Sequence, residues 1–465
     1  MDEISYDVRI YKTDVWKSRR EGGPTTYWVR WKVGKNAPFK RPFKTSALAE
    51  SFRSTLVAAA RKGEAFKQDD GLPISTVRAH SEISWYDFAC QFVDMKWQRC
   101  AATTRRTHAE AMTAVTMAMF AEKRGKPDDM LLRKALTRWA FNTAQRDSAD
   151  CPAEISRALR WTKDHTRKVS ALSDPEILRS VLDAVATKLD GTPGAPSVVS
   201  RRRKILVTAL GYAVERKILE ANPIPALKWS PPKTSHVVDR RRVANPVQAR
   251  TLLNAVRSQQ RTGPRLVAFF GCLYFAALRP EEAVNLTRAN LSLPVAGWGQ
   301  MHLERARPHA GKEWTNSGLN RDERQLKQRA VGESRTVPCP PELTALLHEH
   351  LAAFGTAPDG RLFRGERNAD ELPKNTIIKA WQRARARSFT EEVAASSLAR
   401  TPYDLRHAAV STWLNGGVPP TTVAEWAGHS VEVLLKIYAK CLDGTDAAIQ
   451  RRVQEALGHA ELRRS

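Results

Sequence analysis

Alternating apolar and polar positions near the start of the chain predict a small β-sheet. From Tyr27 to Val33 every second residue is apolar, and aromatic or basic residues lie between. A period of two is typical of a strand that buries one face. Residues 6–10 alternate in the same way, and residues 39–43 add a third strand. We therefore predict a three-stranded sheet whose open face carries Trp, Arg and Lys side chains.

A helix is predicted directly after these strands. Thr45 or Ser46 provides an N-cap, and three apolar residues follow at every fourth position from Leu48. The strands and this helix together predict an α+β domain over residues 1–65. Residues 68–73, which read Gln-Asp-Asp-Gly-Leu-Pro, predict a linker behind it.

From about residue 80 to residue 230 the apolar positions recur with a helical period. Ser84 provides the N-cap of one helix, and residues 173–176 predict a capping box that opens another. A further helix over about residues 197–219 carries four consecutive basic residues near its start. We predict a helical domain over residues 80–230.

The remaining chain, residues 240–465, is again mainly helical in pattern. A nearly all-apolar run over residues 269–278 predicts a buried helix, and it is too short to cross a membrane. Short alternating stretches between residues 300 and 338 predict a small sheet, and residues 446–457 predict a final short helix. The expected fold class is mainly α with small β-sheets, in three domains.

The net charge of the chain indicates which class of partner it binds. Its 465 residues carry 75 Lys and Arg against 49 Asp and Glu, a formal net charge of +26. A protein this basic usually binds a polyanion, and nucleic acid is the first candidate. The chain has no apolar run of membrane-spanning length, and it has no N-terminal charged-then-apolar signal. We therefore expect a cytoplasmic protein with no membrane partner.

The six cysteines are scattered, with no C-x-x-C pair and no Cys/His spacing suited to zinc. This pattern predicts reduced thiols and no metal site.

The stretch from Thr401 to Tyr438 carries the candidate chemistry. It reads Thr-Pro-Tyr-Asp-Leu-Arg-His at its start and Gly-His-Ser from Gly428, and it ends in a tyrosine nine residues after His429. Arginine and histidine suit the binding of a phosphate oxyanion. A tyrosine hydroxyl can attack phosphorus to form a covalent ester.

These strings resemble the C-terminal signature of the tyrosine recombinases, the phage-integrase family. Upstream, the string Leu-Arg-Pro-Glu-Glu that begins at Leu278 resembles the first arginine motif of that family. The resemblance implies that Arg279 and Arg406 hold the nonbridging phosphate oxygens and that His429 donates to one of them. It implies that Tyr438 attacks phosphorus, with no metal and no cofactor.

The resemblance also implies a lysine that protonates the leaving oxygen, in a turn before the strand at residues 334–338. Lys327 lies at a fitting position and is our choice, and Lys312 remains a rival because this segment is longer than the family minimum. Where the family usually has histidine, this chain has Tyr403, and a tyrosine hydroxyl is a weak base near neutral pH. We assign Tyr403 a positioning role and leave the general base open, with His407 interpreted as a buried structural residue.

Basic side chains at three places are candidates for DNA contact. The N-terminal sheet resembles the arm-type DNA-binding domain of many integrases, with a protein-contacting module as the alternative. The basic helix followed by Asn-Pro resembles the last helix of the family's core-binding domain, and residues 229–243 predict a basic interdomain linker. The candidates are Arg30, Lys32, Lys40 and Arg41 in the sheet, Arg201, Arg202, Arg203 and Lys204 in the helix, and Arg240, Arg241 and Arg242 in the linker.

The resemblance implies a site-specific recombinase that cuts and rejoins double-stranded DNA through a 3′-phosphotyrosine, integrating and excising a mobile element. The alternatives are an Xer-type housekeeping recombinase, a type IB topoisomerase and a non-catalytic DNA-binding regulator. The N-terminal domain argues against the first two, and the intact motif residues argue against the third. Expected partners are attachment-site DNA, further copies of the chain in a tetramer joined by exchanged C-terminal tails, and an accessory directionality factor.

Overall fold

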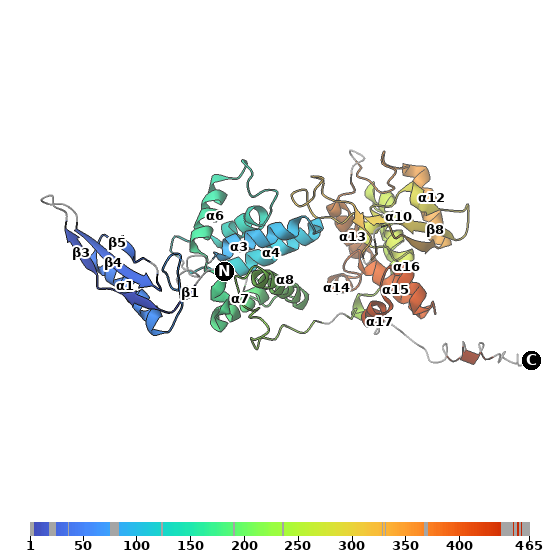
Figure 1. The fold of residues 1–465 in the computed structure, drawn as a ribbon. Helices are drawn as coiled ribbons and strands as arrows, with labels where there is room; N and C mark the ends of the chain where they lie inside the picture. Colours follow the sequence, from blue (N-terminus) through green and yellow to red (C-terminus); the bar gives the residue numbers. More distant parts are fainter. Residues whose placement is uncertain are drawn as a thin grey trace, which may run out of the picture.

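The computed structural model describes most of the chain, and it is mainly helical with several small sheets, as the sequence predicts (Figure 1). Within the described ranges, no helix is both long and apolar enough to cross a membrane. The described residues are 4–17, 25–35, 37–74, 83–121, 124–188, 191–234, 237–327, 329–330, 332–366, 371–438, 450, 453–454 and 457.

The N-terminal region is a four-stranded sheet backed by one helix, and the strand that the sequence did not predict is β3. β4 is its central strand, with β2 and β3 along one edge and β5 along the other. Val29, Trp31 and Val33 are buried, so the predicted alternation along β4 is confirmed. Thr45 caps the helix, because its Oγ1 accepts a hydrogen bond from Leu48 N at 3.3 Å. The elements are β1 (Ile4–Ser5), β2 (Val8–Ile10), β3 (Asp14–Lys17), β4 (Thr25–Val33), β5 (Phe39–Phe43), α1 (Ser46–Arg61) and β6 (Phe66–Lys67).

The segment predicted as a linker at residues 68–73 instead folds back onto this region. Phe66 is fully buried in its core, and Trp31 Nε1 donates a hydrogen bond to Gly71 O. Gly71 has φ +71, and a Cβ there would lie 2.3 Å from the Phe39 ring. Only glycine fits this turn, because a side chain would clash with the aromatic core and strain the backbone.

The helical region that follows has its own apolar core. Ser84 caps its first helix, since its Oγ accepts a hydrogen bond from Asp87 N at 3.1 Å. The predicted capping box at residues 173–176 is wrong: Asp174 is the cap, and its carboxylate accepts from Glu176 N at 2.8 Å. The elements are α3 (Trp85–Trp97), α4 (Ala102–Ala118), α5 (Asp129–Ala135), η1 (Leu136–Ala140), α6 (Ala153–His165), η2 (Val169–Ser173), α7 (Pro175–Ala186) and α8 (Pro196–Glu215).

The C-terminal region packs helices around α10, which is the predicted buried apolar helix. Its sheet has the order β11-β8-β7, and the returning strand lies where the sequence predicts it, with Val337 opposite Met301. The elements are η3 (Arg240–Arg242), α9 (Pro246–Arg257), α10 (Thr262–Phe275), α11 (Pro280–Ala283), η4 (Arg288–Asn290), β7 (Leu291–Ser292), β8 (Gly299–Leu303), β9 (Arg305–Ala306), β10 (Arg324–Gln325), β11 (Arg335–Cys339), α12 (Pro341–Phe354), α13 (Lys374–Ser388), α14 (Glu391–Ala395), α15 (Asp404–Asn415), α16 (Pro420–Ala427) and α17 (Val431–Tyr438).

A loop between β9 and β10, residues 307–323, joins the C-terminal region to the helical region; we call it the docking loop. Its Trp314 is buried in the core of the helical region, where its ring centroid lies 6.1 Å from that of Trp97. Arg105 at the start of α4 donates to Trp314 O at 3.0 Å and to Asn316 Oδ1 at 2.7 Å. The docking loop therefore meets the ends of α3 and α4 that face the C-terminal region (Figure 1).

Two further hydrogen bonds hold the docking loop at its carbonyl groups. Arg106 Nη1 donates to Ala310 O at 3.1 Å, and Asn142 Nδ2 donates to Glu313 O at 2.9 Å. The helical and C-terminal regions are thus connected twice, once by the covalent chain and once by this loop.

The segment predicted as an interdomain linker contacts α17 of the C-terminal region. Val238 N donates to Ile437 O at 2.8 Å, in the last turn of α17. Residues 235–236 of the linker lie outside the described residues. The predicted helix at 446–457 also lies outside them almost entirely, and with it the tail expected to be exchanged between protomers.

Candidate active site

One buried carboxylate organises two arginines that are far apart in sequence. α10 ends at an Ala-Ala-Leu-Arg-Pro sequence, and the proline starts the four-residue α11, so Glu282 folds back onto Arg279. Glu282 Oε1 accepts from Arg279 Nη1 at 2.7 Å, and its Oε2 accepts from Arg335 Nη2 at 2.7 Å. Burial raises the pKa of Glu282, but Arg335, Arg279 and Arg406 overcome that effect and hold it at about 2.

Arg406 is the third arginine of this cluster and is fully buried. Its Nη1 donates to Ala277 O and its Nη2 donates to Ala427 O. Ala277 has φ +49, a conformation that non-glycine residues rarely adopt, so the chain bears local backbone strain where it meets this side chain. The three guanidinium groups and one carboxylate leave a surplus of two positive charges in the cluster.

Gly428 allows the arginines to approach the end of α16. It adopts the left-handed conformation with φ +64, and a Cβ there would lie 1.9 Å from Arg335 Nη1. Its carbonyl accepts from Arg279 Nη2 at 2.7 Å. The glycine of the Gly-His pair is therefore required by the packing of the arginines against the backbone.

His429 completes the cluster as a neutral side chain. Its Nε2 lies 2.7 Å from Arg406 Nη2, which can only donate, so Nε2 accepts and the proton resides on Nδ1. Burial, followed by the charges of Arg406 and Arg279, lowers the pKa of His429 to about 3. His429 Nδ1 and Arg406 Nε are buried donors with no hydrogen-bond partner among the described residues. Such unpaired donors are costly unless a ligand accepts from them.

Tyr438 lies beside this cluster, at the end of α17, and is 1% exposed. Its ring stacks on His429, with centroids 6.2 Å apart and planes at 26°. Its hydroxyl lies 2.8 Å from His407 Nδ1. Tyr403 packs edge-on against the His407 ring at 5.2 Å. The structure therefore places five of the predicted residues together, and His407 joins them in a position that the sequence interpretation did not foresee. The five are Arg279, Tyr403, Arg406, His429 and Tyr438.

Both candidate lysines are exposed. Lys327 lies in a turn after β10, and Lys312 lies in the docking loop. The geometry does not choose between the two lysines.

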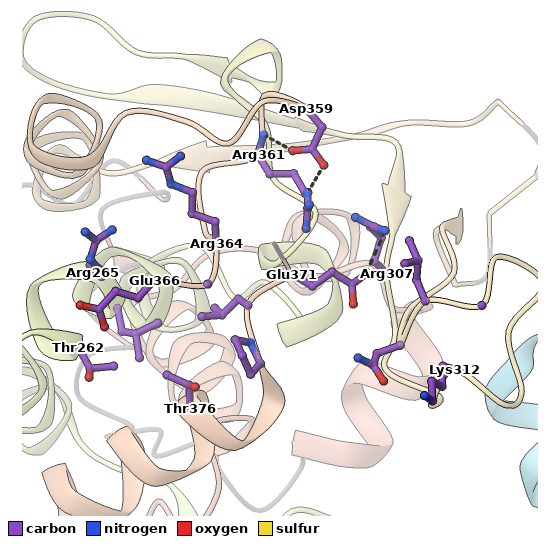
Figure 2. A pocket seen from close by; sticks show the side chains of 17 residues that line it. Thr262, Arg265, Arg307, Lys312, Asp359, Arg361, Arg364, Glu366, Glu371 and Thr376 are labelled. Atoms are coloured by element: carbon purple, nitrogen blue, oxygen red, sulfur yellow. Dashed lines mark hydrogen bonds and ion pairs between the residues drawn. The ribbon is translucent and has the colours of Figure 1, made fainter. Parts of the chain in front are cut away.

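Two cavities of the C-terminal region lie outside the arginine cluster. Figure 2 shows one of about 800 Å³, lined by Arg265, Arg307, Arg361 and Arg364. Acidic side chains offset part of this positive charge, with Arg307 paired to Glu371 at 3.0 Å and Arg361 paired to Asp359 at 2.5 Å. The second cavity, of about 700 Å³, borders Pro280 and Tyr403 at the edge of the cluster and reaches Thr103 of the helical region.

The basic residues predicted to contact DNA are placed in different ways. On the N-terminal sheet, Arg30 and Lys40 lie opposite each other on the face away from α1. Lys40 also lies over the Trp28 ring at 5.5 Å. Arg41 instead lies over Phe52 of α1 at 5.0 Å, so it belongs to the other face. β-strand alternation therefore places Arg41 on a different face of the sheet from Arg30 and Lys40.

The remaining basic candidates lie on α8 of the helical region and in the linker that follows it. On α8, Arg201 and Lys204 are exposed, while Arg202 and Arg203 are partly buried. In the linker, Arg242 Nη2 donates to the buried Asp404 at 2.9 Å, so this residue fixes the linker to the start of α15. Arg241 pairs with Asp239 at 2.7 Å on the surface, and Arg240 is exposed.

Sequence reasoning missed the roles of Glu282, Arg335 and His407. Arg335 carried a detectable signal, because it falls on the same face of its strand as Val337 and Cys339, a face that is buried. A charged residue at a core-facing strand position is unusual and points to a buried partner. The contact between His407 and Tyr438 had no such signal, since it depends on how α15 and α17 pack.

Comparison with known proteins returns integrases and recombinases. No protein-family model and no curated protein matches this sequence. Among solved structures, the Tn1549 transposon integrase in complex with a circular intermediate DNA is 14% identical, with a TM-score of 0.47 over 70% of this chain and 98% of that one. The XerH site-specific recombinase bound to its palindromic difH substrate is 12% identical, with a TM-score of 0.47 over 80% and 95%. A lambda integrase dimer bound to a core site is 14% identical, with a TM-score of 0.38 over 55% and 78%.

Proposed function

We propose that this chain is a tyrosine recombinase that cuts and rejoins double-stranded DNA through a covalent 3′-phosphotyrosine. The observation that carries the proposal is the convergence of Arg279, Arg406, His429 and Tyr438 into one buried cluster with surplus positive charge. Buried charge of one sign calls for an opposite charge, and a phosphodiester supplies it. A tyrosine hydroxyl beside that site is placed to attack the bound phosphorus.

The chemistry follows from the donors of the cluster. The guanidinium groups of Arg279 and Arg406 are held by backbone carbonyls and Glu282, so their remaining N–H groups are oriented before the substrate arrives. His429 Nδ1–H adds a neutral donor. In the transition state negative charge grows on the nonbridging oxygens, and preoriented donors stabilise that charge most. The 5′-oxygen leaves with a proton, for which Lys327 is our candidate donor and Lys312 the alternative.

The wider role we propose is integration and excision of a mobile element. The N-terminal sheet, with Arg30, Lys32 and Lys40 on its open face, would hold a second DNA site, while the helical region and the C-terminal region hold the site that is cut. Assembly as a tetramer through exchanged C-terminal tails, and an accessory directionality factor, belong to the same proposal. An Xer-type recombinase remains the second candidate, because the catalytic cluster serves both equally well.

Trapping on a nicked suicide substrate tests the enzymatic part. Wild-type protein should form a denaturant-resistant adduct with DNA, because the released short strand cannot return to attack the phosphotyrosine. Tyr438→Phe should bind the same DNA and form no adduct. Tyr274→Phe, a change at another buried tyrosine of the C-terminal region, is the matched control and should still form it.

An adduct in the Tyr438→Phe protein would show that another residue is the nucleophile. Binding of DNA with no adduct in the wild-type protein would favour the non-catalytic regulator instead. Recombination should also persist when a metal chelator is added, and a strict requirement for magnesium would contradict the mechanism.

A further inference from the structure

We propose that His407 is the catalytic base of this site, accepting the proton of the Tyr438 hydroxyl as that oxygen attacks phosphorus. The inference rests on the proposed function, because it requires Tyr438 to be the nucleophile. Its basis is the 2.8 Å separation between His407 Nδ1 and the Tyr438 hydroxyl. This separation is within the range that proton transfer requires.

The step balances without an added reactant. The O–H bond of Tyr438 breaks as the new P–O bond forms, and the proton passes to His407 Nδ1. The bond between phosphorus and the 5′-oxygen then breaks, and that oxygen takes a proton from the general acid. When a DNA hydroxyl later attacks the phosphotyrosine, its proton passes to the deprotonated general acid, the bond between phosphorus and the tyrosine oxygen breaks, and His407 returns its proton to that oxygen.

Two neighbouring side chains are less suited to this role. His429 stacks on the Tyr438 ring, but its Nε2 already accepts from Arg406, and its protonated Nδ1 has no lone pair to offer. Tyr403 takes the place of the usual family histidine, but its ring packs against His407 at 5.2 Å. We therefore assign Tyr403 the role of holding the imidazole of His407 in position.

The charges around His407 come from several elements. Asp404 and Arg406 flank it on α15, Arg242 approaches from the linker, and His429 and Tyr438 face it from the segments after α16. Burial lowers the pKa of His407 to about 4, with Asp404 opposing the shift and the arginines adding to it. The imidazole is thus neutral near pH 7, and its lone pair is available.

Substrate binding should strengthen this base. Burial is the main cause of the low pKa of His407, and the positive charges of Arg406 and Arg242 add to it. A phosphodiester bound in the cluster brings negative charge that offsets the contribution of Arg406. The pKa of His407 should therefore rise when DNA is in place.

The test is the pH profile of single-turnover cleavage by His407→Asn. Asparagine keeps a hydrogen-bond acceptor near the Nδ1 position but cannot take up the proton. Wild-type cleavage should change little between pH 7 and pH 9. The variant should cleave more slowly at pH 7 by roughly 10²–10⁴-fold, the usual contribution of general base catalysis. Its rate should then rise about tenfold per pH unit, because only the ionised tyrosine, whose ordinary pKa is ~10, would attack.

The matched control is His350→Asn, which alters a buried histidine bonded to Leu362 O. Its cleavage rate and pH profile should equal those of the wild type. DNA binding by each variant, measured in parallel, shows that the protein is folded. If His407→Asn does not bind DNA, His407→Gly with added imidazole replaces it, and saturable rescue of cleavage is the expected result.

Three results would overturn the inference. Cleavage by His407→Asn at the wild-type rate would leave the proposed function intact and remove His407 from the chemistry. Slow cleavage with a flat pH profile, or no imidazole rescue of a DNA-binding glycine variant, would reduce His407 to holding the tyrosine. Absence of any adduct in the wild-type protein would instead refute the proposed function itself.

Discussion

Arginine side chains lie in two different environments in the N-terminal sheet and in the C-terminal cluster. Arg30 has about half of its side chain exposed and makes one surface ion pair with Asp14. Arg406 is fully buried and is held by Ala277 O, Ala427 O and His429. The exposed arginine can exchange partners at little cost, whereas the buried one is fixed in advance and depends on its surroundings. The first arrangement suits contact with many phosphates, and the second suits one phosphate at a defined point.

The largest effect should come from Arg406→Ala. The change removes the N–H donors of the Arg406 guanidinium and should slow cleavage by about 10²–10³-fold or more. These donors act on the negative charge that develops on the phosphate oxygens in the transition state. DNA affinity should fall far less, because many other basic side chains contribute. Cleavage rates and gel-shift affinities measured side by side would separate the two. Arg387→Ala, on the exposed face of α13, is the control and should change neither. Equal losses in rate and affinity for Arg406→Ala would make it an ordinary phosphate anchor.

Glu282→Gln should destabilise the fold by about 3–5 kcal/mol, because it removes the carboxylate between Arg279 and Arg335. The free energy of unfolding of the wild-type protein should also depend on pH, because the Glu282 carboxylate must stay ionised. Since the folded pKa of Glu282 is lowered to about 2, its contribution is complete above the ordinary pKa of ~4.3 and is lost as pH falls towards 2. Urea unfolding as a function of pH measures both effects.

The neighbouring variant Glu281→Gln is the matched control for Glu282→Gln. Glu281 is only partly buried, and its stability and pH dependence should stay close to the wild type. If Glu282→Gln were as stable as Glu281→Gln, the buried cluster would not depend on its carboxylate.

The smallest effects should come from the N-terminal sheet. Neutralising Arg30, Lys32 and Lys40 together should leave cleavage of a short core-site duplex unchanged. Binding to arm-site DNA should weaken, and the slope of log affinity against log salt should flatten by about 0.9 for each phosphate that is no longer neutralised. Arg41→Ala, on the face covered by α1, should leave that slope unchanged. An unaltered slope in the triple variant would indicate that this sheet contacts protein rather than DNA.

The parts of the fold that sequence could predict are those set by local periodicity and capping. The alternation in β4 and the Thr45 cap depend on neighbouring residues and lie where they were predicted. The apolar run predicted as a helix over residues 269–278 is helical only to Phe275, where α10 ends. The fold back at Gly71 was not predictable, because the aromatic contact that demands glycine comes from a distant strand.

The candidate site shows the same limit. Its motif residues were named from a family resemblance, but the ion-pair network through Glu282 and the contact of His407 with Tyr438 arise only when α11, β11, α15 and α17 pack together. No local pattern contains those contacts. Arg335 is different, because a charged residue at a buried strand position is visible in the sequence and indicates a buried ion pair.

The docking loop tolerates two kinds of sequence change very differently. Three of its four hydrogen bonds to the helical region end on backbone carbonyls, those of Ala310, Glu313 and Trp314. A substitution leaves a carbonyl in place, so most positions of the loop can vary while the connection persists. Insertion or deletion of one residue would move these carbonyls by up to about 3.3–3.6 Å along the chain, a shift large enough to break the hydrogen bonds. This connection therefore constrains the length of the loop more than the identity of its side chains. Trp314 is the exception, because its side chain is buried in the core of the helical region.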